Sequence, residues 1–336
     1  MLSNEVRGHL WGRLVPFWEG LRDRENGGFY GWMDSGLTVD READKGCILN
    51  SRILWFFSNA AICLAGEEGE RAALSGGAAL PGAGGQPARQ RAREREQAQS
   101  PQREQDRADA LKECADWAYR FLRDRCVDAE RGGVYWSLDY RGQPEDTTKH
   151  TYNQAFAVYA LSSYYRAYRD REALELAERL IGVMANRTMN TLLHVLEAYT
   201  EYLGACREEQ ASGVFSRRGL EPGRPGAWRR TVEEKLRRIL NLVAERVYNP
   251  ERRRQEVFFN LSMESLIDLH SYGHDIEAAW LIDRCLEVLG DEGLTRRMSP
   301  MLRSLEAEVY ERAYAHHSLA NECERGVVDE KRVWWV

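Results

Sequence analysis

Apolar residues recur at helical spacing through most of this chain, and this periodicity limits the folds that it can adopt. Between Ala110 and Leu122, apolar side chains return every three or four residues with charged residues between them. This is the pattern of an amphipathic helix with one buried face. The same pattern predicts further helices over 11–22, 48–64, 150–168, 173–184, 188–204, 231–247, 274–289 and 298–314. Helices of this length with short connections indicate an all-α architecture of helical hairpins.

Two short segments interrupt the helices in the same way. Residues 26–34 (NGGFYGWMD) and 131–139 (RGGVYWSLD) each hold a Gly-Gly pair, then an aromatic-rich stretch, then an aspartate. Gly-Gly supplies the positive φ of a tight turn, and the alternation after it predicts a short strand or hairpin. Each segment lies between two predicted helices, so we interpret the pair as a weak internal repeat. Such units stack as an open solenoid or close into an (α/α) barrel, and the aromatic hairpins favour the barrel.

Two other stretches lack apolar periodicity. Residues 67–108 are of low complexity, rich in Ala and Gly and then in Arg, Glu and Gln, and predict a flexible surface insertion whose latter part, 88–108, extends the following helix. Residues 206–228 contain several Gly and Pro residues and predict a polar loop. The remainder of the 336 residues is expected to form one domain.

Composition excludes several classes of protein. The net charge of −6 argues against non-specific nucleic-acid binding, which requires a basic surface. No uninterrupted apolar run approaches the roughly 20 residues that span a bilayer, and the N-terminus lacks a signal-peptide pattern, so we expect a cytoplasmic protein without a membrane segment. The seven cysteines are scattered, with no CxxC pair, which argues against a disulfide framework and a structural zinc site.

Polar residues open two of the predicted apolar helices. Arg52 lies amid Leu49, Ile53 and Leu54, where an arginine must be paired or must face a polar cavity. Tyr152 belongs to the polar run Lys-His-Thr-Tyr-Asn-Gln that begins the helix over 150–168. A structural ion pair is the simpler alternative for Arg52.

Two further helices carry histidines. Asn190, His194 and Glu197 share one helical face at four- and three-residue spacing, and His274 and Glu277 are three apart near a helix N-terminus. A histidine on an apolar face is more often a core residue than a catalyst, so each also has a purely structural interpretation. HExxH spacing is absent, and no metal site is expected.

The strings around these residues are similar to the signature motifs of cellobiose 2-epimerases, in the same order along the chain. They are NGGFYGWMD (26–34), DKGCILNSRILWFFS (44–58), KHTYNQAFAVYALS (149–162), NTLLHVLEAYTEY (190–202), SYGHDIEAAWL (271–281) and RVWW (332–335). The resemblance implies an (α/α)6 barrel and reversible epimerisation at C2 of the reducing-end glucose of cellobiose or a similar β-1,4 disaccharide. It implies no cofactor, no nucleic-acid or membrane partner, and a monomer or weak homodimer.

The chemistry explains the residue types. C2 of an aldose is acidic only when the ring is open, and histidine, with an ordinary pKa of about 6.5, suits proton transfer near neutral pH. By resemblance, His274 is one of two acid/base histidines and Glu277 orients it, while Arg52 and His194 contact the enediolate, the negative charge of which a donor stabilises. The residues expected to line the pocket or to stack on sugar rings are Tyr152, Asn190, Trp334 and Trp335, with the aromatics of the Gly-Gly hairpins.

The second acid/base histidine of the family follows a W-W-x-Q-x-E string, and this chain stops at Val336, within that string. The resemblance therefore implies an incomplete ring that lacks its last helical hairpin. We expect little or no epimerase activity from these 336 residues alone.

Two alternatives remain open. One keeps the fold but changes the reaction, to an N-acylglucosamine 2-epimerase or a mannose-type aldose–ketose isomerase. The other is a non-catalytic carbohydrate-binding remnant. The sequence does not separate the sugars, because all these reactions begin with proton removal at C2.

Overall fold

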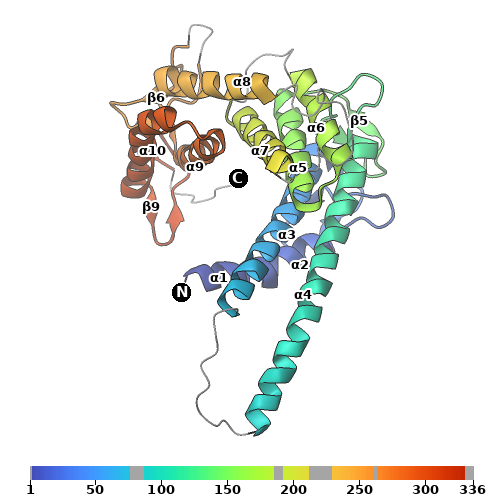
Figure 1. Cartoon of the computed structure of the whole chain (residues 1–336). Helices are drawn as coiled ribbons and strands as arrows, with labels where there is room; N and C mark the ends of the chain where they lie inside the picture. The colour runs from blue at the N-terminus through green and yellow to red at the C-terminus, as the bar shows by residue number, and fades with distance from the viewer. Residues whose placement is uncertain (1, 76–86, 185–191, 212–228, 260–262, 330–336) are drawn as a thin grey trace. The chain divides into compact units, whose positions relative to one another are not determined.

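The computed structural model describes residues 2–75, 87–184, 192–211, 229–259 and 263–329. These residues form two compact units, 1–188 and 189–336. Figure 1 gives the order of the elements along the chain, and each unit is described by itself.

The first unit is built on α3, α4 and α5. Helix α3 packs against both of the others, and α5 also packs against α6. Every residue of α5 from Asn153 to Tyr165 is buried, as expected for an inner helix that is apolar nearly all round. The helices of this unit are α1 (Leu2–His9), the π-helix η1 (Leu10–Leu14), α2 (Val15–Gly20), α3 (Cys47–Ser75), α4 (Pro87–Phe121), the π-helix η2 (Leu122–Cys126), α5 (Thr151–Tyr168) and α6 (Arg171–Met184).

The second unit repeats this organisation with α7 packed against α8 and α9, and α9 against α10. Helix α9 ends at Gly290, whose left-handed φ of 64° is the usual glycine stop. Asp291 then caps α10 by accepting a hydrogen bond from the backbone N–H of Leu294. The helices are α7 (Leu192–Ala211), α8 (Arg229–Leu242), the π-helix η4 (Val243–Val247), α9 (Tyr272–Leu289) and α10 (Glu292–Arg312).

Short antiparallel strands join the helices. In the first unit β1 pairs with β2, and β4 lies between β3 and β5; in the second β6 pairs with β7, β9 with β10, and β11 lies between β12 and β8. The strands are β1 (Trp32–Met33), β2 (Val39–Asp40), β3 (Lys45–Gly46), β4 (Ser137–Leu138), β5 (Pro144–Asp146), β6 (Tyr248–Asn249), β7 (Arg254–Gln255), β8 (Leu269–Ser271), β9 (Tyr314–Ala315), β10 (Ser318–Leu319), β11 (Glu322–Glu324) and β12 (Val327–Val328).

The predicted helices are confirmed wherever the structure describes them, and helix also continues into both stretches that lack apolar periodicity. Helix α3 continues to Ser75 and α4 begins at Pro87, so only 76–86 of the stretch 67–108 lies outside the described residues. The predicted outward extension over 88–108 is therefore confirmed; Figure 1 shows this part of α4 running away from α5 and α6. Its Arg, Glu and Gln residues are strong helix formers. Likewise α7 continues to Ala211, so 206–211 is helix rather than loop.

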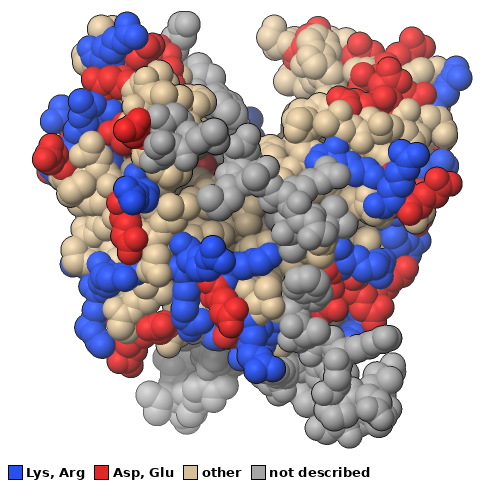
Figure 2. All heavy atoms as spheres, turned by 90° about the horizontal axis from the view of Figure 1, so that it is seen from above, with Lys and Arg blue, Asp and Glu red and all other residues tan. Residues whose placement is uncertain are grey.

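Helix α3 contains one long apolar segment. The segment Cys47–Gly66 of α3 is long and apolar enough to cross a membrane by length and composition, and half of its apolar window is buried inside the protein. Packing against α4 and α5 accounts for this apolarity, because a helix between two others needs apolar residues on more than one face. On the face drawn in Figure 2, basic and acidic side chains are interleaved, in keeping with the small net charge.

Candidate functional site

Each Gly-Gly hairpin is built around one buried aspartate. In the first hairpin, Asp23 accepts two backbone N–H bonds from the turn that follows it, and Lys45 Nζ lies 2.6 Å from its Oδ2. In the second, Asp128 accepts two such bonds and Lys149 Nζ lies 2.5 Å from its Oδ2. The bond from Lys149 holds the pKa of Asp128 at about 2. Burial would raise the pKa of Asp23, but the bonds from Lys45 and the backbone lower it.

A side-chain amide then ties each hairpin to the helix after it. Asn50 Oδ1, in α3, accepts a bond from the N–H of Phe29 at 3.0 Å. Gln154 Oε1, in α5, accepts one from the N–H of Val134 at 2.6 Å. The predicted internal repeat is therefore present as a repeated hydrogen-bond frame. Gly28 is required in it, because a Cβ there would lie 2.7 Å from the ring of Phe121.

The second unit contains a third hairpin of this kind, formed by β6 and β7, which the sequence did not predict. Asn249 Oδ1 accepts two backbone N–H bonds from the next turn, at 3.1 Å each, as the aspartates do. Arg253 adopts the positive φ, 53°, where the other hairpins have glycine. Asp275 accepts a hydrogen bond from the Gln255 N–H at 3.1 Å, and so ties this hairpin to α9 as Asn50 and Gln154 tie the other two to their helices. The sequence did not predict this third hairpin because it lacks a Gly-Gly pair. The only local sign of it was the short gap around Asn249 between two predicted helices.

Four of the predicted site residues lie close to an anchor of the repeat. Asn50, Gln154 and Asp275 are its equivalent anchors, each near the start of a helix. Arg52 and Glu277 both lie two residues after their anchor, whereas Tyr152 and His274 lie two and one residues before theirs. The first two turns of the helices that follow hairpins therefore carry these four residues.

In the first unit the structure brings Arg52 and Tyr152 together over one ring. The Arg52 guanidinium carbon lies 5.2 Å from the centroid of the Phe156 ring, a cation–π distance, and the Tyr152 ring meets the same ring edge-on at 4.9 Å. Trp32 and Trp136 on the hairpins are exposed, at 57% and 39%, and so are accessible to a ligand as predicted for the hairpin aromatics.

In the second unit the structure brings the two predicted histidines within electrostatic reach. His194 and Glu197 form the expected pair on α7, with Nδ1 3.2 Å from Oε2. His274, on α9, is half-buried, and its Nδ1 lies 2.7 Å from Ser271 Oγ. Burial lowers the pKa of His274, and repulsion from His194 lowers it further. A lowered pKa favours the neutral imidazole, which is the form that can accept a proton.

A buried His–Asp pair lies beside His274. His270 Nε2 is 2.8 Å from Asp275 Oδ2, and the two side chains are 6% and 2% exposed. His270 precedes Asp275 by five residues, as Lys45 precedes Asn50. Burial raises the pKa of Asp275, although the bond with His270 opposes this. Ser271, His270 and Asp275 were not among the predicted site residues, since their roles depend on contacts across a strand–helix junction.

Three predicted residues, Asn190, Trp334 and Trp335, lie outside the described residues, and Glu277 lies half-buried one turn after His274 on α9. Among the side chains that the structure describes, no three His, Cys, Asp or Glu residues are grouped as a metal site requires.

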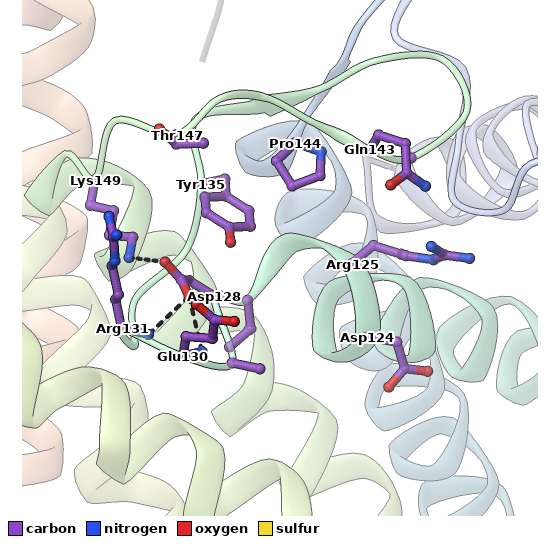
Figure 3. A pocket seen from close by; sticks show the side chains of 13 residues that line it. Asp124, Arg125, Asp128, Glu130, Arg131, Tyr135, Gln143, Pro144, Thr147 and Lys149 are labelled. Carbon is purple, nitrogen blue, oxygen red and sulfur yellow. Dashed lines mark hydrogen bonds and ion pairs between the residues drawn. The ribbon is translucent and has the colours of Figure 1, made fainter.

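A cavity of about 450 Å³ lies beside the second hairpin, and none of the predicted site residues lines it. Figure 3 shows Lys149 and the backbone of the turn converging on Asp128 at its wall, with Arg125 farther along. Its lining residues are Asp124, Arg125, Val127, Asp128, Ala129, Glu130, Arg131, Tyr135, Gly142, Gln143, Pro144, Thr147 and Lys149.

Comparison with known proteins gives consistent matches. The sequence model of the N-acylglucosamine 2-epimerase (GlcNAc 2-epimerase) family matches residues 98–336. A protein named cellobiose 2-epimerase from Eubacterium cellulosolvens is 39% identical, with 100% of this chain and 79% of the relative covered. Another of that name from Ruminococcus albus is 37% identical, with 100% and 78% covered.

Solved structures agree in fold. A sugar epimerase from a ruminal bacterium matches with a TM-score of 0.76 and 35% identity, covering 100% of this chain and 78% of that one. A cellobiose 2-epimerase from Bacillus thermoamylovorans B4167 matches with a TM-score of 0.76 and 32% identity, covering 99% and 78%. These likenesses confirm the expected all-α fold class of the (α/α) barrel type.

Proposed function

The chain belongs to the N-acylglucosamine 2-epimerase family, and from this premise we propose that it acts on cellobiose, exchanging the configuration at C2 of the reducing-end glucose. It is an isomerase of the epimerase type that processes a sugar. The names of its relatives support the disaccharide, and the predicted cytoplasmic location and monomeric or weakly dimeric state stay predictions.

The observation that carries the proposed chemistry is the state of His274. A general base must be unprotonated at working pH and held within reach of its proton. Nδ1 of His274 lies 2.7 Å from Ser271 Oγ, which holds the ring, and burial and the neighbouring His194 lower the pKa of His274, which favours the unprotonated form.

The remaining roles follow from charge. When the C2 proton leaves the open-chain sugar, negative charge develops on O1, and a cation or N–H donor there lowers the barrier. We assign this to Arg52 and His194, with Tyr152 and Asn190 lining the pocket, Glu277 orienting His274, and Trp334 or Trp335 stacking on a sugar ring. None of these steps requires a cofactor.

Incubation of the full chain with cellobiose in D₂O tests the proposal. Deuterium at C2, followed by NMR, reports proton removal alone, while the appearance of glucosyl-mannose reports the complete epimerisation. We expect exchange at C2, which requires proton removal alone and which His274→Asn abolishes; such exchange is compatible with the little or no complete epimerisation that the sequence predicts. Exchange with N-acetylglucosamine or mannose but not with cellobiose would favour the alternative reactions, and binding of cellobiose without exchange would favour a carbohydrate-binding protein.

A further inference from the structure

Ser271 occupies the N-cap position of α9 but does not cap the helix. An N-cap serine ordinarily accepts a hydrogen bond from the second or third backbone N–H of its helix. The Ser271 side chain makes no such bond. Its Oγ lies 2.7 Å from Nδ1 of His274, the side chain at the third helical position.

Ser271 and Asp275, which lie on either side of His274 in this turn, are both buried and bonded to neighbouring elements. Ser271 is 5% exposed and ends β8, where it pairs with Glu322 of β11. Asp275 is 1% exposed and binds both the Gln255 N–H and the His270 ring. The hydroxyl therefore meets the imidazole from a rigid strand, and the residue next to the imidazole is anchored to the third hairpin.

We propose that Ser271 is the positioning residue of His274: its hydroxyl holds Nδ1 and so sets the orientation of the ring, with Nε2 as the nitrogen that transfers the proton. The proposal rests on the proposed function. When the C2–H bond breaks, the proton forms the Nε2–H bond, the electron pair of that bond forms the C1–C2 double bond, and the carbonyl π pair moves onto O1. Because a hydroxyl oxygen accepts from Nδ1–H whether the ring is neutral or protonated, this contact persists through the step.

The chemistry of the partner matters as well as its position. His194 and His270 each lie beside a carboxylate, of Glu197 and Asp275 respectively, whereas His274 meets a hydroxyl. A hydroxyl fixes the ring orientation and adds no charge. The lowered pKa of His274 agrees with a base that is ready at neutral pH.

The test compares Ser271→Ala, Ser271→Thr and a matched control, Ser299→Ala, in the full chain. Ser299 lies on α10 and its Oγ bonds only to a carbonyl of its own helix, Thr295 O at 2.7 Å, so its loss should leave the site unchanged. The ring-nitrogen shifts of ¹⁵N-histidine protein are measured, with His274 assigned by its loss in His274→Asn. The kcat and KM for C2 exchange with cellobiose are measured on the same proteins.

We expect His274 in the unaltered chain to carry its proton on Nδ1. Ser271→Ala should lose this preference and lower kcat by about tenfold or more, with KM within about twofold, because a misplaced base slows the step without weakening binding. Ser271→Thr should restore both readouts. The melting temperature of Ser271→Ala should change little, since the hydroxyl caps nothing.

Unchanged ring-nitrogen shifts in Ser271→Ala would overturn the contact, and changed shifts with unchanged kcat would overturn its catalytic role. If the unaltered chain exchanges no proton of any sugar, the proposed function fails, and the nitrogen shifts still decide whether Ser271 holds Nδ1.

Discussion

The first and third hairpins share a backbone frame but distribute charge in opposite ways. In the first, the carboxylate sits in the hairpin, on Asp23, and the helix presents a neutral amide, Asn50. In the third, the hairpin presents the neutral Asn249, and the carboxylate has moved to the helix as Asp275, paired with His270. The frame needs one acceptor at each position, and either acceptor can be the carboxylate, with Lys45 buried beside Asp23 and His270 buried beside Asp275.

The difference has a consequence for His274. Because the third anchor is an aspartate, the residue directly after His274 is tied both to the hairpin and to the strand before the helix. The first two anchors are amides that also bond on both sides: Asn50 holds the Phe29 N–H and the Gly46 carbonyl, and Gln154 holds the Val134 N–H and the His150 carbonyl. The residues around these two anchors include no predicted acid/base group, so the third hairpin is the one that combines the common frame with the site where proton transfer is expected.

Loss of Lys45 should have the largest effect. Lys45 and Asp23 are 0% and 1% exposed at the side chain, so Lys45→Met leaves a buried carboxylate without its cation. Removing one partner of a buried pair costs about 3–5 kcal/mol. Denaturant unfolding followed by circular dichroism would measure this, with Lys149→Met as the matched control; that pair is 12% and 10% exposed, so its loss should be smaller. An equal or smaller loss for Lys45→Met would contradict the importance of burial in the first hairpin.

A change of Asp275 to Asn should cost less, because it gives the third hairpin the amide anchor of the other two. The Asn oxygen can still accept the Gln255 N–H, while His270 loses a charged partner, so we expect a loss of about 1–3 kcal/mol in unfolding free energy. The reverse change, Asn50→Asp, adds a carboxylate at a fully buried position, and it should cost more. A larger loss for Asp275→Asn would mean that the two anchors are not equivalent.

These contacts mark where prediction from sequence stops. Helices and the first two hairpins could be predicted, because apolar periodicity and Gly-Gly are local signals. The third hairpin could not, since Arg253 takes a positive φ that the sequence gives to glycine elsewhere. His194 and His274 were predicted by motif, and both lie in the second unit, where His194 contributes to the lowered pKa of His274. Ser271 was missed because an N-cap serine predicts a helix cap, and only the structure shows the hydroxyl turned to the imidazole.

Replacement of His194 should have the smallest effect, and it separates the two causes of the His274 shift. His194→Gln removes the repulsion but leaves the burial, so the pKa of His274 should rise toward 6.5 without reaching it. The sign follows because a positive neighbour disfavours the imidazolium; at pH 6, less of the variant's His274 is neutral. A ¹⁵N-histidine NMR titration would measure this directly. His317→Asn, in the exposed turn between β9 and β10 where Asn tolerates positive φ, serves as control. No change in the pKa of His274 would leave burial as its whole cause, and a fall would mean that His194 favours the imidazolium. Either result would weaken the case that α7 and α9 act on the same proton.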